Sequence, residues 1–219
     1  MRSNKIHENL MKNQAFNFFS VGEDYQRNVV ENKNMVKGVI TFKGTYMTTV
    51  YVSEENLKSL VHHKLHTAGL DADTAQQVTD VLIHADITGV HSHGVMRVEH
   101  YCTRLAAGGL NKAPQFSIEQ ISPSVAILDS DDGMGHSALI SATEHAIKLA
   151  LEEGAGFVSV KNTSHCGALS YFAEMVTNKG LVAIVMTQTD TCVAPHGGAE
   201  RFWVLTPSPL VSRWKTAIR

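Results

Sequence analysis

Histidine is the most distinctive residue of this 219-residue chain, which contains 12 of them. Two short motifs combine histidine with glycine, His91-Ser92-His93-Gly94 and Ser164-His165-Cys166-Gly167. Imidazole is the side chain best suited to moving a proton near neutral pH. The second motif lies between a predicted strand and a predicted helix, where the sites of α/β proteins gather. His165 is therefore a candidate general acid/base, and a loop histidine without chemistry is the alternative.

Arg97 and Tyr101 follow the first motif. If a helix begins near Gly94, these two side chains are four residues apart and share one face, with His93 at its N-terminal end. A guanidinium group can hold a carboxylate through two parallel hydrogen bonds. Histidine, arginine and tyrosine together predict a pocket for a small carboxylate. A solvated helix face is the alternative.

The segment 133–138, GMGHSA, matches the G-x-G-x-x-A pattern of dinucleotide-binding turns. Two features weaken the match. Asp131 and Asp132 would repel a pyrophosphate, and the preceding strand is predicted to be the second strand of a hairpin rather than the first of a βαβ unit. A simple helix-entry turn is the favoured interpretation.

Two other groups of residues deserve a hypothesis. Pro195-His196-Gly197-Gly198 predicts a tight loop that could approach a ligand or simply turn the chain. His62, His63 and His66 have helical spacing, but no carboxylate or cysteine is placed to complete a metal site. We therefore expect no metal and predict a solvated helix face for these histidines.

Composition excludes several classes of protein. The formal net charge of −2 argues against a basic nucleic-acid binder. Cys102, Cys166 and Cys192 are widely spaced and form no CxxC pair, which favours a reducing compartment. A thiol-nucleophile role for Cys166 lacks an identifiable orienting residue. The aliphatic run 181–186 is far shorter than the roughly 20 residues that span a bilayer, so we expect a cytoplasmic protein without membrane or nucleic-acid partners.

Apolar periodicity divides the chain into a helical segment, 47–114, and an α/β segment, 115–202. Ser53 predicts the N-cap of the first helix, and Asp73 with Gln76 resembles a capping box for the second. Alternating strands and helices in the second segment predict an α/β layer. The predicted helices are 53–69, 73–89, 95–107, 136–153 and 168–178, and the predicted strands are 116–121, 125–128, 157–160 and a buried strand at 181–187.

The first 46 residues contain seven asparagines and no lasting apolar period. This composition predicts an extension without stable structure. A second hypothesis is that the extension is not natively translated. Residues 43–47, KGTYM, can be encoded by AAAGGAACTTATATG, which places a ribosome-binding sequence just ahead of a start codon at Met47.

Three stretches together resemble the malate/L-lactate dehydrogenase family of NAD(P)-dependent oxidoreductases, which do not use a Rossmann fold. They are ADITGVHSHGVMRVEHY (85–101), SHCGALSYF (164–172) and VAPHGGAERF (193–202). They occur in the family's order and spacing, and the resemblance covers residues 52–202. It implies an N-terminal helical segment followed by a partial cofactor domain with a mixed sheet.

The resemblance also implies an activity. It is the transfer of hydride from a small 2-hydroxy acid to NAD, with NADP as the alternative cofactor. Ureidoglycolate, an intermediate of allantoin breakdown, is the substrate expected first, and malate or lactate is the alternative. His165 would accept the hydroxyl proton while His93, Arg97 and Tyr101 line the substrate pocket. The implied cofactor contacts are Thr189, Gly197 and Gly198, and the implied assembly is a homodimer.

Residues 203–219 depart from the family pattern. After Phe202 the family continues in the style of F-G-T-N-P-[IL]-A-F, whereas this chain reads WVLTPSPLVSRWKTAIR. One coding of 202–219 reads FLGTNPIAFGFPVENGHP when a single T is added after the first codon. We therefore expect an out-of-frame tail, and an inactive, truncated remnant of such an enzyme is an alternative for the whole chain.

Overall fold

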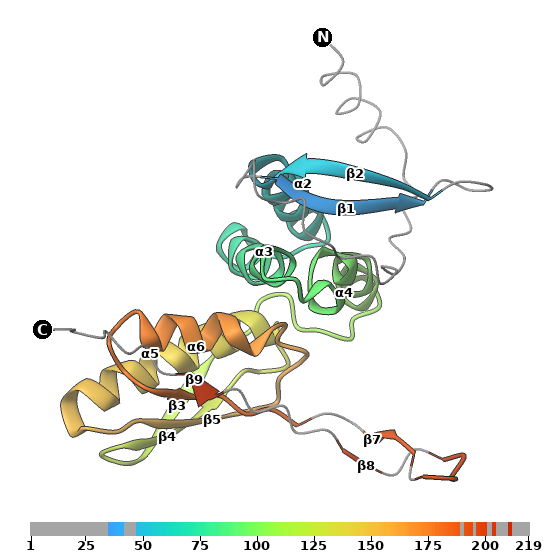
Figure 1. The fold of residues 1–219 in the computed structure, drawn as a ribbon. Helices are drawn as coiled ribbons and strands as arrows, with labels where there is room; N and C mark the ends of the chain where they lie inside the picture. The colour runs from blue at the N-terminus through green and yellow to red at the C-terminus, as the bar shows by residue number, and fades with distance from the viewer. Residues whose placement is uncertain are drawn as a thin grey trace, which may run out of the picture.

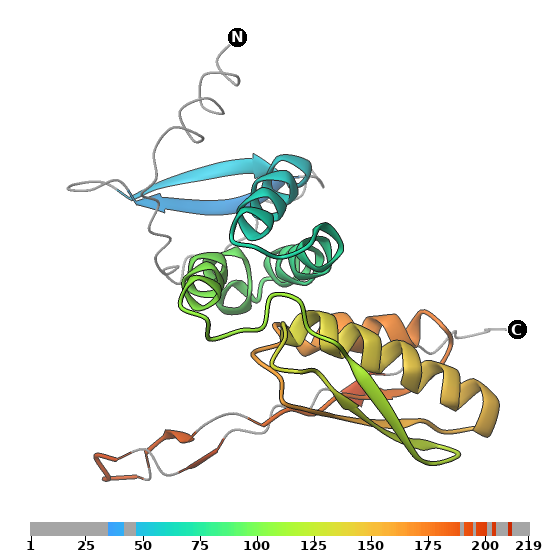
Figure 2. The ribbon, with the colours of Figure 1, turned by 180° about the vertical axis from the view of Figure 1, so that it is seen from behind.

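The structure is a computed structural model that describes residues 35–41, 47–188, 191–194, 196–200, 203–204 and 210–211. Three helices and a β-hairpin form one part, and a sheet covered by two helices forms the other (Figure 1). The view from behind shows the helical part stacked on the helix-covered side of the sheet (Figure 2). The predicted succession of a helical segment and an α/β segment is therefore present.

The helical part contains α2 (Glu54–Thr67), α3 (Ala72–Ile87) and α4 (Val98–Ala106). Ser53 caps α2 as predicted, since its hydroxyl accepts the backbone N–H of Asn56 at 3.3 Å. The predicted cap of the second helix was wrong by two residues. The carboxylate of Asp71 accepts the N–H of Thr74 at 2.9 Å, and it precedes the helix in the extended conformation that an N-cap requires.

Apolar faces of these helices meet in one core. Leu65, Val78 and Leu82 have no or almost no exposed surface, and Tyr101 of α4 is 2% exposed among them. Burial of such side chains is the main stabilising contribution to folding, about 1.5–3 kcal/mol for each large one. The core fixes the position of α4, and with it the position of the Tyr101 ring.

The second part is a three-stranded mixed sheet with the order β3-β4-β5. Strand β3 (Ser117–Ser122) pairs antiparallel with β4 (Val125–Asp129), and β4 pairs parallel with β5 (Phe157–Lys161). The expected mixed sheet is thus confirmed. Helix α5 (Gly135–Glu153) connects the two parallel strands, so β4 also opens a βαβ unit. The expectation that it belonged only to a hairpin was wrong, because one strand can pair with a different neighbour on each side.

Helix α6 (Leu169–Thr177) follows β5 and packs beside α5 on the same side of the sheet (Figure 1). Strand β6 (Ala183–Ile184) pairs with β9 (Leu210–Val211), and β7 (Thr191–Val193) pairs with β8 (Trp203–Val204). The β7–β8 hairpin projects from the body as an arm (Figures 1 and 2).

The predicted buried strand at 181–187 was wrong in length and in burial. Only Ala183 and Ile184 form a strand, and Ala183 is buried whereas Ile184 is 65% exposed. Val182 and Met186 are each 66% exposed. Side chains alternate between the two faces of extended chain. Within the described residues, only the face that carries Ala183 and Val185 packs against other elements.

Residues Met35–Thr41 form strand β1, which pairs antiparallel with β2 (Met47–Ser53). Strand β1 falls within the first 46 residues, where the composition predicts no stable structure. The remainder of that range lies outside the described residues.

No helix in the described ranges is long and apolar enough to span a membrane.

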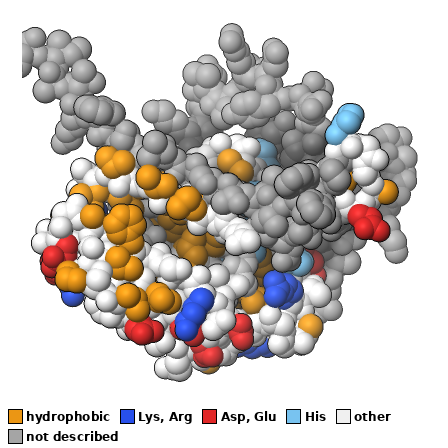
Figure 3. Space-filling model, turned by 90° about the horizontal axis from the view of Figure 1, so that it is seen from below, with side chains coloured by type: hydrophobic (Ala, Val, Ile, Leu, Met, Phe, Trp, Pro, Cys, Tyr) orange, Lys and Arg blue, Asp and Glu red, His pale blue; other side chains and the backbone are white. Residues whose placement is uncertain are grey.

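The view from below shows hydrophobic side chains gathered over part of the surface (Figure 3). Large hydrophobic side chains that are exposed include Ile118, Ile121, Leu151, Phe157, Val182, Ile184 and Met186.

Candidate functional site

His165 lies in the loop between β5 and α6, and the start of α5 holds this loop in place. The hydroxyl of Ser164 accepts the N–H of Gly135 at 2.9 Å and donates to the carbonyl of Gly133 at 3.1 Å. A Cβ atom at Gly135 would clash with the carbonyl oxygen of Ser164 and lie 2.7 Å from that of His165. The glycine pattern at 133–138 therefore serves the close approach of two chain segments, as the helix-entry interpretation favoured.

Helix α4 brings Tyr101 to His165. The phenol oxygen of Tyr101 lies 2.7 Å from Nδ1 of His165, a short hydrogen bond between residues 64 positions apart. Burial raises the pKa of Tyr101 well above its ordinary value, so the phenol keeps its proton. The fold therefore brings His165 of the α/β segment against α4 of the helical segment.

His93 and Arg97 surround the same imidazole. The rings of His93 and His165 lie 5.3 Å apart between centroids. Burial, with smaller contributions from the neighbouring His93 and Arg97, lowers the pKa of His165 to about 4. Burial and the Arg97 charge also lower the pKa of His93. Both shifts favour the neutral imidazole, and a neutral imidazole can act as a base.

Arg97 occupies the N-cap position of α4, after a short 3₁₀ turn, Val95–Arg97. The prediction of one continuous helix over 95–107 was therefore wrong in its first turn. Nε of Arg97 donates to the carbonyl of Ser92 at 2.7 Å. Among the described residues, the terminal nitrogens of the guanidinium have no hydrogen-bond or ion-pair partner. They remain available for a carboxylate.

Asp86 holds the loop that carries His93, a role that sequence analysis did not find. Its carboxylate accepts the N–H of Val95 at 2.7 Å and lies 2.9 Å from Nδ1 of His91. Asp86 is 8% exposed, and burial raises its pKa while these hydrogen bonds oppose the shift. A Cβ atom at Gly94 would clash with this carboxylate. The signal in the sequence was an acidic residue at the end of an otherwise apolar helix face.

His136 is a second residue that sequence analysis did not single out. It is completely buried at the start of α5, and its Nε2 lies 3.5 Å from the phenol oxygen of Tyr101. The two rings meet edge to face at 79°, with centroids 5.1 Å apart. Burial, with a smaller contribution from His165, lowers the pKa of His136 to about 3. His136 belonged to the glycine-rich pattern, where only the glycines drew attention.

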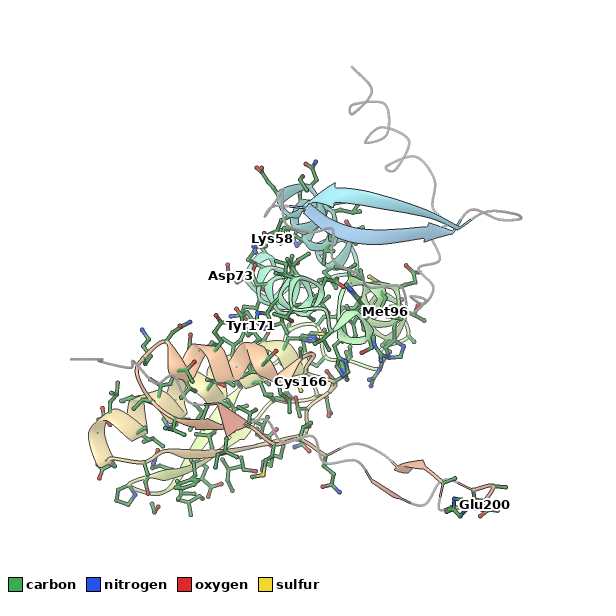
Figure 4. The ribbon with its side chains drawn as sticks, viewed as in Figure 1. Lys58, Asp73, Met96, Cys166, Tyr171 and Glu200 are labelled. Carbon is green, nitrogen blue, oxygen red and sulfur yellow. The ribbon has the colours of Figure 1, made fainter. Side chains whose placement is uncertain are left out.

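The structure does not bring every predicted residue to this cluster. Gly197 and Gly198 are exposed in the β7–β8 arm, and Thr189 lies outside the described residues. Figure 4 shows Glu200, which follows Gly198 by two positions in the sequence, at the end of the arm, whereas Cys166 lies where the two parts of the fold meet. Cys166 is buried, which raises the pKa of its thiol and disfavours the nucleophilic thiolate.

His62 and His66 of α2 have structural partners, whereas His63 is exposed as predicted for a solvated helix face. Nε2 of His62 lies 3.2 Å from the carbonyl of Ala72, and Nδ1 of His66 lies 2.8 Å from that of Leu70. Because a carbonyl only accepts, both rings donate and close the turn between α2 and α3. Nowhere in the described ranges do three His, Cys, Asp or Glu side chains gather as metal ligands would.

Comparison with known proteins identifies the family to which this chain is related. The family model for malate/L-lactate dehydrogenase matches residues 52–212. Ureidoglycolate dehydrogenase (NAD(+)) of Escherichia coli O157:H7 is 42% identical over 156 residues, which are 71% of this chain and 45% of that protein. Malate dehydrogenase of Pyrococcus abyssi is 37% identical over 166 residues, 76% of this chain and 46% of the relative.

The fold agrees with this assignment. The structure of malate dehydrogenase from Pyrococcus horikoshii OT3 superposes with a TM-score of 0.73 at 33% identity, covering 80% of this chain and 51% of that one. Sulfolactate dehydrogenase from Methanocaldococcus jannaschii gives a TM-score of 0.70, also at 33% identity, covering 74% and 47%. The chain spans about half the length of the relatives it matches. The family match and these folds show that the chain belongs to the malate/L-lactate dehydrogenase family.

Proposed function

We propose that this chain carries the substrate-side residues of a dehydrogenase that oxidises a small 2-hydroxy acid with NAD. The observation that supports it most directly is the position of His165. This candidate base is hydrogen-bonded to Tyr101 and lies beside Arg97, a side chain that can bind a carboxylate. Membership of a dehydrogenase family supplies the reaction class.

His165 is the proton acceptor in this proposal. Oxidation of a secondary alcohol removes a proton from oxygen and a hydride from carbon, and the base must be neutral before the reaction. A pKa of about 4 keeps His165 neutral across the physiological range. Tyr101 orients the ring from the buried side, where its own raised pKa prevents it from losing a proton.

Arg97 is the residue that holds the substrate carboxylate. Its Nε is fixed by Ser92, which leaves the terminal nitrogens to form a bidentate pair. His93 lies beside His165 and lines the same pocket. Ureidoglycolate is the preferred substrate because the relative at 42% identity carries that name. Malate and sulfolactate are the alternatives, from relatives at 37% and 35%.

The cofactor is NAD in this proposal, and NADP is the alternative. When bound, the nicotinamide supplies the hydride acceptor. Thr189, Gly197 and Gly198 are the residues proposed to contact it. The segment 196–200 is exposed, and the space around Gly197 is open, so its backbone can approach a ligand closely. This division of roles fits the neutral His165, which accepts the proton while the cofactor accepts the hydride.

The proposed division of the chain is a helical substrate-side segment, 47–114, and part of a cofactor domain, 115–202. We also propose that 203–219 are read out of frame, that residues 1–46 are a non-native extension, and that the intact enzyme is a cytoplasmic homodimer. Sequencing the gene across the codon for Phe202 in independent reads tests the frame. Reads that agree on the present frame overturn this part of the proposal.

Activity is tested with two proteins, the 219-residue chain and the chain from a gene with one base added after the codon for Phe202. Each is mixed with NAD or NADP and with ureidoglycolate, malate, lactate or sulfolactate, and reduced nicotinamide is followed by absorbance. Activity in either protein supports the dehydrogenase, and the substrate with the highest kcat/KM identifies its class. If only the product of the gene with the added base is active, the 219-residue chain is an inactive remnant. No reduction of either cofactor by either protein overturns the proposed function.

A further inference from the structure

The nitrogen with which His165 accepts a proton follows from its contacts. Nδ1 lies 2.7 Å from the phenol oxygen of Tyr101 and 3.3 Å from the backbone N–H of Gly167, so it faces the protein. Nε2 is the other ring nitrogen and has no hydrogen-bond partner among the described residues. A neutral imidazole carries one proton, and a base needs a free lone pair. If Nε2 accepts the substrate proton, Nδ1 must carry the ring proton beforehand.

That tautomer also determines the direction of the phenol hydrogen of Tyr101. When Nδ1–H of His165 donates to the phenol oxygen, the phenol hydrogen must point to another acceptor. In the described part of the chain, the one other acceptor within hydrogen-bond distance of this oxygen is Nε2 of His136, at 3.5 Å. His136 then accepts through Nε2 and carries its own proton on Nδ1.

We propose that His136 is a positioning residue that, through Tyr101, keeps the ring proton of His165 on Nδ1 and leaves Nε2 free. This inference rests on the proposed function, in which His165 is the base. The N–H of Gly167 favours the opposite tautomer, because it can donate only to an unprotonated Nδ1. With no acceptor at position 136, Tyr101 would donate to Nδ1 as well, and both contacts would place the ring proton on Nε2.

The surroundings of His136 fit this task. The ring is completely buried, and Nδ1 has no partner among the described residues, so the phenol of Tyr101 is the one hydrogen-bond partner of this side chain in the described part of the chain. Burial disfavours the imidazolium, so His136 accepts a hydrogen bond without taking up the proton. The backbone of Gly167 packs closely against the His136 ring, since a Cβ atom at Gly167 would lie 3.0 Å from Nε2 of His136 and 2.8 Å from the side chain of Val81.

The test is the tautomer of His165 in the 219-residue chain, read from ¹⁵N resonances of the imidazole nitrogens near neutral pH. These resonances separate a protonated from an unprotonated ring nitrogen without any assay of activity. A His165→Gln variant assigns the signals. The wild-type chain is expected to show the proton on Nδ1, and a proton on Nε2 overturns the proposal even if no variant folds.

Two variants of His136 sharpen the result. His136→Gln offers an amide oxygen to Tyr101 and should keep the proton on Nδ1, whereas His136→Leu offers no acceptor and should move it to Nε2. His145→Gln, at a partly exposed histidine of the same helix, is the matched control. An unchanged tautomer in folded His136→Leu, verified by circular dichroism, contradicts the inference.

A kinetic readout distinguishes this inference from the proposed function. In whichever protein proves active, His136→Leu should lower kcat by about 10- to 100-fold with little change in KM, and His136→Gln should restore most of it. If His165→Ala keeps full activity, the proposed base is wrong, whatever the tautomer. If His165→Ala is inactive but His136→Leu is unaffected, only the role of His136 is wrong.

Discussion

The phenol oxygen of Tyr101 lies 2.7 Å from Nδ1 of His165, and this contact joins the helical part of the fold to the α/β part. Tyr101 is held by the apolar core of α2, α3 and α4, while His165 is held by the start of α5. Packing in both parts therefore determines the distance between these two side chains. The site depends on the relative position of the two segments.

Replacement of His165 tests the base. In an active preparation, His165→Ala should lower kcat by roughly 10²–10⁴-fold, because a general base contributes about that factor. Steady-state kinetics with a 2-hydroxy acid and NAD measure the effect. His63→Ala, an exposed histidine of α2, is the control and should leave kcat unchanged. Retention of more than half the wild-type kcat by His165→Ala would refute the assignment.

Replacement of Arg97 tests the carboxylate contact. Arg97→Lys keeps the charge but loses the planar fork, so KM for the hydroxy acid should rise about 10- to 100-fold while the affinity for NAD stays nearly constant. The magnitude corresponds to one charged hydrogen bond, about 1.5–3 kcal/mol. Arg104→Lys, a partly exposed arginine of α4 that donates to the carbonyl of Gly109 at 3.2 Å, is the control. Unchanged KM and kcat in Arg97→Lys would place Arg97 on a solvated face.

Replacement of Gly94 tests the loop support. Gly94→Ala places a methyl group against the buried carboxylate of Asp86, so the free energy of unfolding should fall by about 1–3 kcal/mol. Gly109→Ala is the matched control, because the nearest atom to its Cβ is at an ordinary 3.5 Å. Its effect should stay within about 0.5 kcal/mol. Urea denaturation followed by circular dichroism measures both, and equal stability of the two variants would contradict the structure.

The folded chain should lose stability in acid. In the unfolded chain His136 and His165 titrate near pKa 6.5, whereas burial lowers their folded pKa values to about 3 and about 4. Above pH 6.5 both states are neutral at these residues and no difference arises. As the pH falls from 6.5 toward 4, only the unfolded state binds the protons, so the free energy of unfolding decreases.

Urea midpoints measured between pH 4 and pH 7 test this expectation. His136→Gln removes one of the two groups and should flatten the decline, while the control His145→Gln, at a partly exposed position of α5, should leave it unchanged. A midpoint that does not move over this range would show that the two imidazoles are not desolvated in the folded protein.

The activity of His165 as a base should follow the same shift. In the oxidation direction, kcat/KM should remain nearly constant down to well below pH 6.5 and fall toward pH 4, where the imidazole becomes protonated. A pH–rate profile on an active preparation checks it, and a loss of activity centred near 6.5 would show an unshifted histidine.

Local patterns in the sequence were enough to predict most elements. Ser53 marks the start of α2, and the strand predicted at 125–128 corresponds to β4 (Val125–Asp129). These features are set by residues a few positions apart, so the sequence records them directly. The three motifs that resembled a dehydrogenase family were likewise sufficient for the family that the comparisons show. Boundaries were less certain, as the shift of the α3 cap from Asp73 to Asp71 illustrates.

Burial and long-range contacts could be decided only by the tertiary structure. Tyr101 and His165 were each singled out from the sequence, but their hydrogen bond spans 64 positions and depends on how two segments pack. His136 and Asp86 acquire their importance because neighbouring elements remove them from water, which shifts their pKa values and makes each hydrogen bond costly to lose. No local pattern records which elements will cover a side chain, because desolvation is a property of the assembled core.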